Sequence, residues 1–179
     1  TIKNNKIAML IFNKKLSVSP ITTHLPLKDV HKHITQKKIY NHVELINNFY
    51  NKKFKKKPKI AITGLNPHCE SNFKNCEEDA LIIPAIKRLR TRNFKVEGPF
   101  PADTIFMQEH LKKFDIIVGM YHDQVLTPMK ALYGFDAINI TLGLPFVRIS
   151  PDHGPNSSML GKNTSNPKSL IKALKFLDK

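Results

Sequence analysis

Asp115-Ile116-Ile117-Val118-Gly119-Met120-Tyr121-His122-Asp123-Gln124 is the stretch of sequence that decides the fold. Its apolar run is typical of a strand buried on both faces, and a helical pattern at 124–132 follows almost at once. Short β-rich runs and longer helical patterns alternate in the same way along most of the chain. This alternation predicts an α/β fold.

The other expected elements lie on either side of this strand. A hairpin is expected at the start, with strands at 7–12 and 16–19 joined through the turn Asn13-Lys14-Lys15. Further strands are expected at 59–63, 95–98 and 137–142, and helices at 27–33, 36–54, 76–91, 104–112 and 166–177. Because no repeat, low-complexity tract or linker interrupts the pattern, we expect residues 1–179 to form one α/β lobe.

Length and composition restrict the class of protein. With 179 residues and 41% hydrophobic content, the chain can bury a core. No apolar run approaches the roughly 18 to 20 residues of a membrane span, and no secretory signal begins the sequence. We therefore expect a cytoplasmic protein with no membrane partner. Cys69 and Cys76 form neither a disulfide framework nor a Cys-x-x-Cys motif, which favours reduced thiols.

The formal charge of +15 raises the question of a nucleic-acid partner. The densest basic block is 52–59, where six lysines end a helical pattern just before a strand. No aromatic residues alternate with these lysines in a way that suggests base stacking. A solvated helix end explains the block better, so we expect no nucleic-acid partner.

Three histidines share one sequence context, because each ends a strand-like run or lies in the loop after it. They are His24, His68 and His122. Ligand sites of open α/β sheets form at the carboxyl ends of strands, where three imidazoles could bind a divalent cation. Taken singly, each is more typical of a surface or loop histidine. Their spacing matches no short metal motif.

The segment 121–154 also collects groups that suit an anionic ligand. Lys130 offers a compact charge, Arg148 a planar fork and Asn139 both a donor and an acceptor. A helix cap at Lys130 and a surface pair at Arg148 explain the same residues equally well. Beyond them, His153-Gly154 and Gly161-Lys162-Asn163 can turn tightly, and Asn166 is placed to cap the last helix. No Gly-x-Gly-x-x-Gly element supports an ordinary dinucleotide site.

Five longer motifs resemble, in order and spacing, the 4-hydroxythreonine-4-phosphate dehydrogenase (PdxA) family. The motifs are Thr22-Thr23-His24-Leu25-Pro26-Leu27, Gly64-Leu65-Asn66-Pro67-His68, Gly98-Pro99-Phe100-Pro101-Ala102-Asp103-Thr104, Tyr121-His122-Asp123-Gln124 and Asn139-Ile140-Thr141-Leu142-Gly143-Leu144-Pro145-Phe146. The resemblance implies a three-layer α/β sheet like that of isocitrate and isopropylmalate dehydrogenases, with the family's N-terminal portion missing. After His68 the family usually has a glycine-rich stretch, which residues 69–75 lack.

The resemblance also implies an activity. It is the NAD- or NADP-dependent oxidation of 4-phosphooxy-L-threonine, a phosphorylated amino acid, followed by decarboxylation to 3-amino-2-oxopropyl phosphate in pyridoxal phosphate biosynthesis. The resemblance implies one divalent ion as well: zinc, magnesium or cobalt. The alternatives are a paralogous dehydrogenase for another phosphorylated or carboxylated hydroxy acid, and an inactive fragment.

Site roles follow from the same resemblance, residue by residue. It makes His24, His68 and His122 the metal ligands, and Lys130, Asn139 and Arg148 the substrate-binding residues. Asp103 and Asp123 become the catalytic candidates, and His153, Gly154 and Asn166 the cofactor candidates. The family implies a homodimer with its site at the interface, in which one metal ligand comes from the neighbouring subunit. Because the family's N-terminal portion is absent, this chain alone is expected to be inactive.

Overall fold

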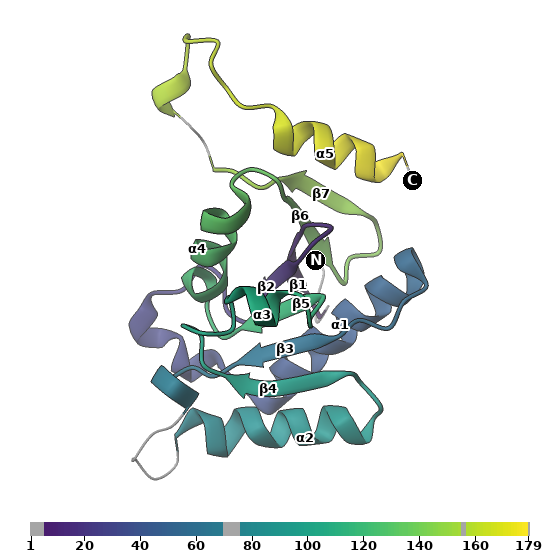
Figure 1. Ribbon diagram of the computed structural model, residues 1–179, viewed down its shortest axis with the longest axis vertical. Coiled ribbons are helices and arrows are strands. Elements are labelled where there is room, and N and C mark those ends of the chain that lie inside the picture. The colour runs from purple at the N-terminus through teal and green to yellow at the C-terminus, as the bar shows by residue number, and fades with distance from the viewer. Residues whose placement is uncertain (1–5, 70–75, 155–156, 179) are drawn as a thin grey trace.

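The computed structural model describes residues 6–69, 76–154 and 157–178. A seven-stranded mixed sheet runs through the centre of the molecule, in the order β4-β3-β5-β2-β1-β6-β7 (Figure 1). The strands are β1 (Ala8–Phe12), β2 (Ser17–Pro20), β3 (Ile60–Thr63), β4 (Val96–Phe100), β5 (Ile116–Gly119), β6 (Ile138–Leu142) and β7 (Arg148–Pro151). The α-helices are α1 (Gln36–Phe54), α2 (Ile83–Thr91), α3 (Gln108–Leu111), α4 (His122–Tyr133) and α5 (Lys168–Leu177).

Helices cover both faces of the sheet, which confirms the expected three-layer α/β fold. Ile116 and Val118 of β5 belong to the core under α1, α2 and α5. Ile117, between them, belongs to the core under α3 and α4. Successive side chains of a strand point to opposite faces, so a strand buried on both faces must be apolar throughout. This requirement explains the unbroken apolar run at 116–118.

Strand direction determines which loops meet. β2 and β3 both pair in parallel with β5. β1 is antiparallel to β2 and to β6, so β6 runs in the same direction as β2, and β7 runs against it. The carboxyl ends of β2, β3, β5 and β6 therefore meet the amino end of β7 at one edge of the sheet. We call this the histidine edge, because the loops carrying His24, His68 and His122 leave from it.

Two expected helices are wrong in type or extent. The segment 27–33 forms two 3₁₀ turns, Leu27–Asp29 and His31–His33, closed by bonds from Val30 N to Leu27 O and from Ile34 N to His31 O. Each turn buries one apolar residue, Val30 or Ile34, and neither is long enough to develop an α-helical face. The expected helix at 104–112 shortens to α3, because Met107 before it has an extended ψ of 149°.

The expected helix at 76–91 is present, but it contains a π-helical turn at Glu78–Ile82 before α2 begins. Pro84 has no N–H to give to the carbonyl of Ala80, so it cannot continue the helical ladder there. The Ala80 carbonyl instead accepts a hydrogen bond from Gln36 Nε2 at 3.1 Å. The proline and this contact together account for the irregular first turn.

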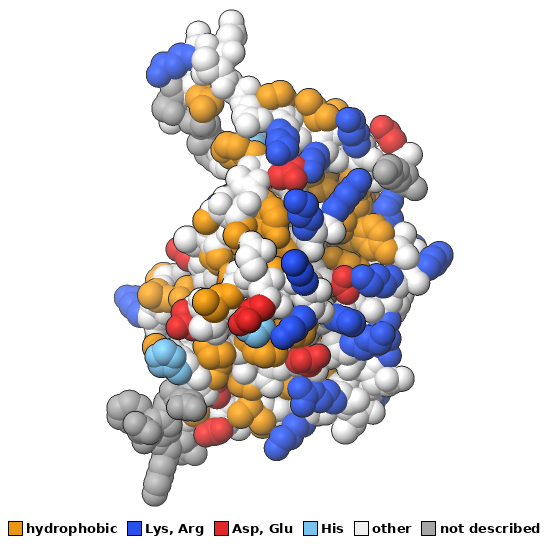
Figure 2. Space-filling model, viewed as in Figure 1, with side chains coloured by type: hydrophobic (Ala, Val, Ile, Leu, Met, Phe, Trp, Pro, Cys, Tyr) orange, Lys and Arg blue, Asp and Glu red, His pale blue; other side chains and the backbone are white. Residues whose placement is uncertain are grey.

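Strand β7 was not predicted from the sequence. It is an edge strand whose side chains are exposed or half-buried, so it carries no continuous apolar run. Figure 2 shows Lys and Arg side chains concentrated on the side where α5 and the end of α1 lie. Within the described ranges, no helix combines the length and the hydropathy needed to cross a bilayer.

Candidate functional site

The histidine edge brings His24 and His122 together. His24 lies in the loop after β2, and His122 is the first residue of α4, two positions after the buried Met120. Their ring centroids are 5.7 Å apart with the planes tilted by 42°. The two loops are joined beneath the rings, because both the backbone N–H and the hydroxyl of Thr22 donate to the carbonyl of Met120, at 3.1 and 2.8 Å.

The ring of His122 is oriented by its neighbour in sequence. Nδ1 of His122 lies 2.6 Å from Oδ1 of Asp123. A carboxylate can only accept, so Nδ1 carries the hydrogen and Nε2 keeps its lone pair. Carboxylate partners of this kind are typical of metal-binding histidines. The His122 side chain is one-third exposed and can therefore be reached from solvent.

The arrangement of His24 and His122 fits a shared metal ion. Two imidazoles on one tetrahedral ion, with bonds of ~2 Å, have ring centroids roughly 5 Å apart, close to the observed separation of 5.7 Å. His68 is exposed in the turn Pro67–Cys69 and has a positive φ of 60°. Among the described residues, no group of three His, Cys, Asp or Glu side chains could hold a metal ion. His24 and His122 therefore lie together within one chain. The binding of a metal ion by His24, His68 and His122 together stays a prediction.

Substrate candidates Asn139 and Arg148 lie on strands β6 and β7. Asn139 stands opposite Ile11, whose side chain faces α3 and α4, so Asn139 shares that sheet face. Arg148 Nη1 donates to Thr141 Oγ1 at 2.7 Å near the histidine edge, and its side chain is exposed. Oδ1 of Asn139 is buried, and no partner among the described residues reaches it. An unpaired acceptor of this kind suits a hydroxyl or ammonium donor from a ligand.

Lys130 lies farther from the histidines. It is eight positions after His122 on α4, which corresponds to about 12 Å of helix rise. Its Nζ donates to the backbone carbonyl of Asp152 and, at 2.6 Å, to the carboxylate of the same residue. Asp152 directly follows the carboxyl end of β7, whose amino end lies at the histidine edge. The ion pair therefore lies toward the opposite ends of the strands. The substrate candidates are thus divided between the two edges.

The predicted cofactor residues line one cavity of about 320 Å³. The residues around it are Lys130, Phe135, His153, Gly154, Met159, Ser165 and Asn166. The rings of Phe135 and His153 are nearly perpendicular, with centroids 6.4 Å apart. Asn166 Oδ1 accepts a hydrogen bond from Lys168 N at 3.0 Å, but the N-cap of α5 is Pro167, so Asn166 lies one residue before the position at which a cap was expected. Sequence reasoning therefore grouped three residues that do lie around one space.

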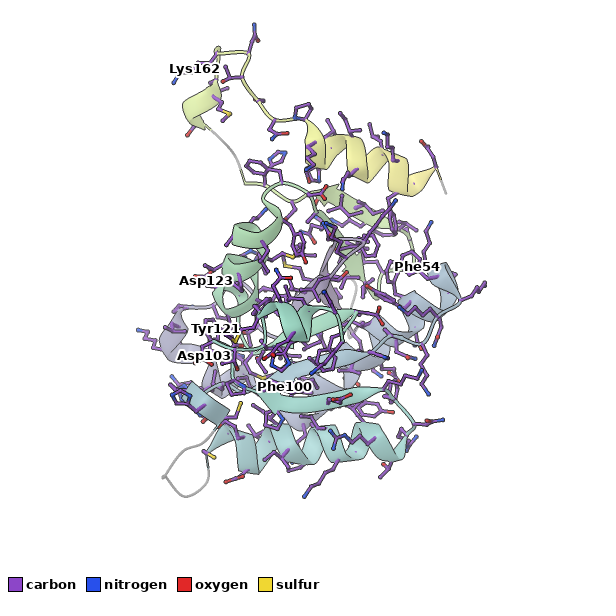
Figure 3. All side chains as sticks on the ribbon, viewed as in Figure 1. Phe54, Phe100, Asp103, Tyr121, Asp123 and Lys162 are labelled. Carbon is purple, nitrogen blue, oxygen red and sulfur yellow. The ribbon has the colours of Figure 1, made fainter. Side chains whose placement is uncertain are left out.

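The catalytic candidates Asp103 and Asp123 lie on the same side of the molecule as Tyr121 (Figure 3). Asp103 follows β4 in an exposed turn. Asp123 is 79% exposed and is engaged with His122. Sequence reasoning missed Thr141 and Asp152, the partners of Arg148 and Lys130. The only signal for Asp152 was its position next to His153, because the pairing itself depends on how α4 lies over β7.

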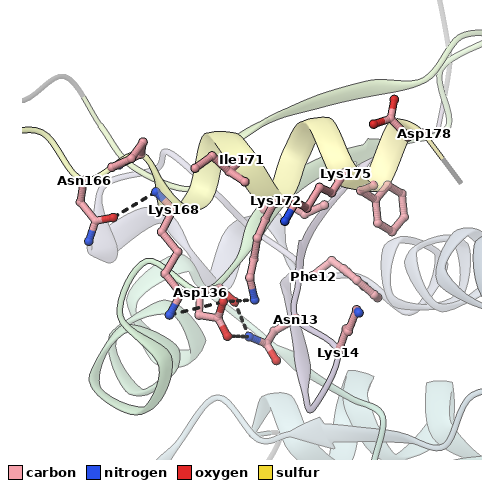
Figure 4. Close-up of a pocket in the computed structure, with 13 residues that line it drawn as sticks. Phe12, Asn13, Lys14, Asp136, Asn166, Lys168, Ile171, Lys172, Lys175 and Asp178 are labelled. Atoms are coloured by element: carbon pink, nitrogen blue, oxygen red, sulfur yellow. Dashed lines mark hydrogen bonds and ion pairs between the residues drawn. The ribbon is translucent and has the colours of Figure 1, made fainter.

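A cavity of about 760 Å³ lies between α5 and the β1–β2 turn (Figure 4). Phe12, Ile138 and Phe176 are among its apolar residues. Asp136 in its wall accepts from Lys172 and Asn13. Of the predicted site residues, it shares only Asn166 with the cofactor cavity. It therefore lies apart from the histidine edge.

A model of the family described as "Pyridoxal phosphate biosynthetic protein PdxA" matches residues 1–177. The chain belongs to the PdxA family. A 4-hydroxythreonine-4-phosphate dehydrogenase from a Sulfurihydrogenibium species is 50% identical over 171 residues, covering 94% of this chain and 52% of the relative. One from Bradyrhizobium diazoefficiens is 41% identical over 170 residues, covering 94% and 49%. The chain thus spans about half the length of these curated relatives.

Solved PdxA-family structures show the same fold. The 4-hydroxythreonine-4-phosphate dehydrogenase of Klebsiella pneumoniae superposes with a TM-score of 0.82 at 34% identity, over 97% of this chain and 54% of that one. A terephthalate 1,2-cis-dihydrodiol dehydrogenase from Burkholderia xenovorans, at 21% identity and a TM-score of 0.76, shares the fold alone. The expected family and fold are confirmed. The departure from the family pattern at 70–75 lies outside the described residues.

Proposed function

We propose that this chain is part of an NAD- or NADP-dependent dehydrogenase that oxidises 4-phosphooxy-L-threonine. The product then loses carbon dioxide to give 3-amino-2-oxopropyl phosphate, in pyridoxal phosphate biosynthesis. The observation that carries the proposal is the approach of His24 and His122, 5.7 Å apart, at strand ends of a PdxA-family chain. The names of the matched relatives support the substrate.

The histidines would hold one divalent ion, with His68 as the third ligand. When bound, zinc, magnesium or cobalt would act as a Lewis acid toward negative charge on the substrate oxygen. Asp123 holds the proton on Nδ1 of His122 and so keeps Nε2 available. Because His24 and His122 are gathered without His68, we further propose a homodimer in which a partner subunit completes the site.

The polar groups around the sheet would bind the ends of the substrate. Arg148 and Lys130 are the cations available for carboxylate and phosphate, and the unpaired Oδ1 of Asn139 would accept from the ammonium or hydroxyl group. A bound nicotinamide would supply the hydride acceptor, and the proton of the substrate hydroxyl would have to pass to a base of the protein. Asp103 and Asp123 are the candidate bases, because both lie on the same side of the molecule as Tyr121, which directly precedes His122.

The cavity lined by His153, Gly154 and Asn166 is the proposed position of part of the cofactor. Its aromatic walls, Phe135 and His153, offer apolar contact to a flat ring system. The cytoplasm is the proposed compartment, since it supplies both NAD and NADP. This assignment would put that part of the cofactor beside Lys130, which lines the same cavity.

The test joins this chain to the unmatched half of the Sulfurihydrogenibium relative and measures NADH or NADPH formation from 4-phosphooxy-L-threonine. We expect chelator-sensitive turnover that returns when metal is added back, and none from this chain alone. His122→Ala should remove both bound metal and turnover. His33→Ala, an exposed histidine in a 3₁₀ turn, is the matched control and should remove neither.

Two outcomes would decide against the proposal. Stoichiometric bound metal and unchanged turnover in His122→Ala would show that His122 is not a metal ligand. Turnover of another phosphorylated or carboxylated hydroxy acid, with none of 4-phosphooxy-L-threonine, would make the chain part of a paralogous dehydrogenase. A panel of such acids therefore belongs in the same assay.

A further inference from the structure

Gln124 joins two of the loops that carry the candidate metal ligands. Its Oε1 accepts from the Thr63 hydroxyl at 2.8 Å and from Met120 N at 2.7 Å. Its Nε2 donates to the carbonyl of Gly64 at 2.8 Å. Three of the four hydrogen-bonding positions of the amide are thus used, and the side chain is 9% exposed. One buried side chain therefore holds the carboxyl ends of β3 and β5 together.

These contacts lie at the base of the histidine loops. Gly64 begins the loop that carries His68, and Met120 precedes His122 by two positions. The carbonyl of Met120 is also the acceptor for Thr22, two positions before His24. All three histidine loops are consequently tied to the backbone around Met120, and Gln124 supplies the only described side-chain link from there to Gly64.

The far side of the His68 loop is held by Glu78. Its Oε1 accepts from the backbone N–H groups of Leu65 and Asn66, at 2.7 and 2.8 Å. Its Oε2 accepts from the Asn66 side chain at 2.9 Å. Burial alone would raise the pKa of Glu78, but the hydrogen bonds from Asn66 and Leu65 bring it below its ordinary value. The loop from Gly64 to His68 is thus fixed at its start by Gln124 and at its middle by a carboxylate.

Close packing keeps Gln124 in this position. A Cβ atom at Gly119 would lie 3.0 Å from Gln124 Oε1 and 2.4 Å from Val125 Cγ1. The absence of a side chain at 119 allows the first turn of α4 to approach the end of β5. A buried glutamine used for packing alone would need neither this approach nor partners in two separate loops.

We propose that Gln124 is a positioning residue that fixes the His68 loop and His122 on one rigid surface of the subunit. Each histidine then meets its co-ligands correctly across the proposed dimer, and Gln124 thereby sets the metal affinity of the site. The proposal rests on the proposed function, because it takes these histidines as ligands. Gln124 need not touch the ion, since its effect passes through Gly64 and Met120. A purely structural glutamine would lower stability without a selective effect on the two loops.

The experiment uses the full chain and five variants, one of which, His122→Ala, tests the metal assignment itself. Gln124→Met keeps the length of the side chain and removes all three bonds, while Thr63→Val removes one bond with little change of shape. Gln124→Glu keeps the acceptor for Thr63 and Met120 and loses the donor to Gly64, so it should recover part of the effect. Tyr50→Phe is the control, because it removes a buried bond to Ser17, 3.0 Å long, on the other face of the sheet.

Two readouts are needed, one with metal and one without. Cobalt titration, followed by the visible spectrum, should show at least a tenfold weaker affinity in Gln124→Met and a smaller loss in Thr63→Val. Hydrogen exchange of the metal-free chain should accelerate together in segments 63–69 and 119–122. Tyr50→Phe should lower the unfolding midpoint and change neither readout.

Each outcome bears on the proposal separately from the proposed function. If His122→Ala binds cobalt as tightly as the wild type does, the metal assignment fails. The hydrogen-exchange data alone then decide whether Gln124 couples the loops. If Gln124→Met behaves like Tyr50→Phe in both readouts, the positioning role is overturned. Should Gln124→Met not fold, Thr63→Val decides by the same comparison.

Discussion

Lys130 donates to the carboxylate of Asp152 at 2.6 Å, and the Asp152 side chain is 7% exposed. Asp152→Asn should lower the free energy of unfolding by about 1–3 kcal/mol, because the half-buried ammonium of Lys130 loses its charged partner. Urea unfolding measures the change. Asp29→Asn, which breaks the more exposed pair with Lys32, is the control and should cost less than about 1 kcal/mol. Equal losses in the two variants would contradict this account of Asp152.

His42 should make stability depend on pH below neutrality. Burial, and then the charge of Lys38, lower the pKa of His42 from 6.5 to about 3. The folded state therefore binds this proton less readily than the unfolded state does. The contribution of neutral His42 to stability is fully present well above pH 6.5 and is lost below it, with a slope that approaches about 1.4 kcal/mol per pH unit toward pH 5. Urea unfolding at pH 7, 6 and 5 measures this slope.

The control for this prediction is His42→Gln. The Ser19 hydroxyl donates to the carbonyl of Met9, so its oxygen accepts from Nε2 of His42, 2.7 Å away. A glutamine amide can donate to the same oxygen and does not titrate. The slope between pH 7 and 5 should become shallower in His42→Gln. A slope equal to that of the wild type would assign the pH dependence to other groups.

Asp123→Ala should weaken cobalt binding by about 10- to 100-fold, because His122 loses the carboxylate that orients its ring. Isothermal titration of the chain with cobalt measures the affinity. Glu109→Ala is the matched control, since Glu109 also lies next to a histidine in sequence, with Oε1 3.5 Å from His110 Nε2. An affinity unchanged in Asp123→Ala, or equally weakened in Glu109→Ala, would count against the orientation of His122.

Gly119→Ala should destabilise the fold by about 1–3 kcal/mol, because the added methyl group would lie 2.4 Å from Val125 Cγ1. The double variant Gly119→Ala/Val125→Ala removes that contact. Thermal unfolding of the two single variants and the double variant completes the cycle. We expect the double variant to lose less stability than the sum of the single losses. Strict additivity would show that the two sites do not clash.

The apolar pattern was sufficient to predict most of the fold. A run such as 115–120 is typical of a strand covered on both faces, and α1 buries Ile39, Val43 and Ile46 at helical spacing, as expected. The edge strand β7 could not be predicted in this way, because an edge strand with half-exposed side chains has no such pattern. The prediction of a helix at 27–33 was wrong for a related reason. Two short 3₁₀ turns bury too few residues for their periodicity to be visible in the sequence.

The candidate site was less predictable than the fold. The position of His24 and His122 after strand-like runs was enough to predict that they lie close together, because the carboxyl ends of parallel strands share an edge of the sheet. The same reasoning could not show that Lys130 pairs with Asp152, or that Gln124 joins Thr63 to Met120. Those contacts depend on how α4 lies over the sheet. The sequence places both residues on the helix without specifying their partners.

The course of α4 has a consequence for which molecules could bind. The helix begins at the histidine edge and carries Lys130 about 12 Å along its axis, toward Asp152. A molecule held by both the histidine end and the lysine end must be long enough to join them. Shorter hydroxy acids would reach one end only and lose the contacts at the other. Discrimination by size would then depend on the number of turns in a helix, so inserting or deleting one turn of α4 should shift the preferred chain length of the substrate.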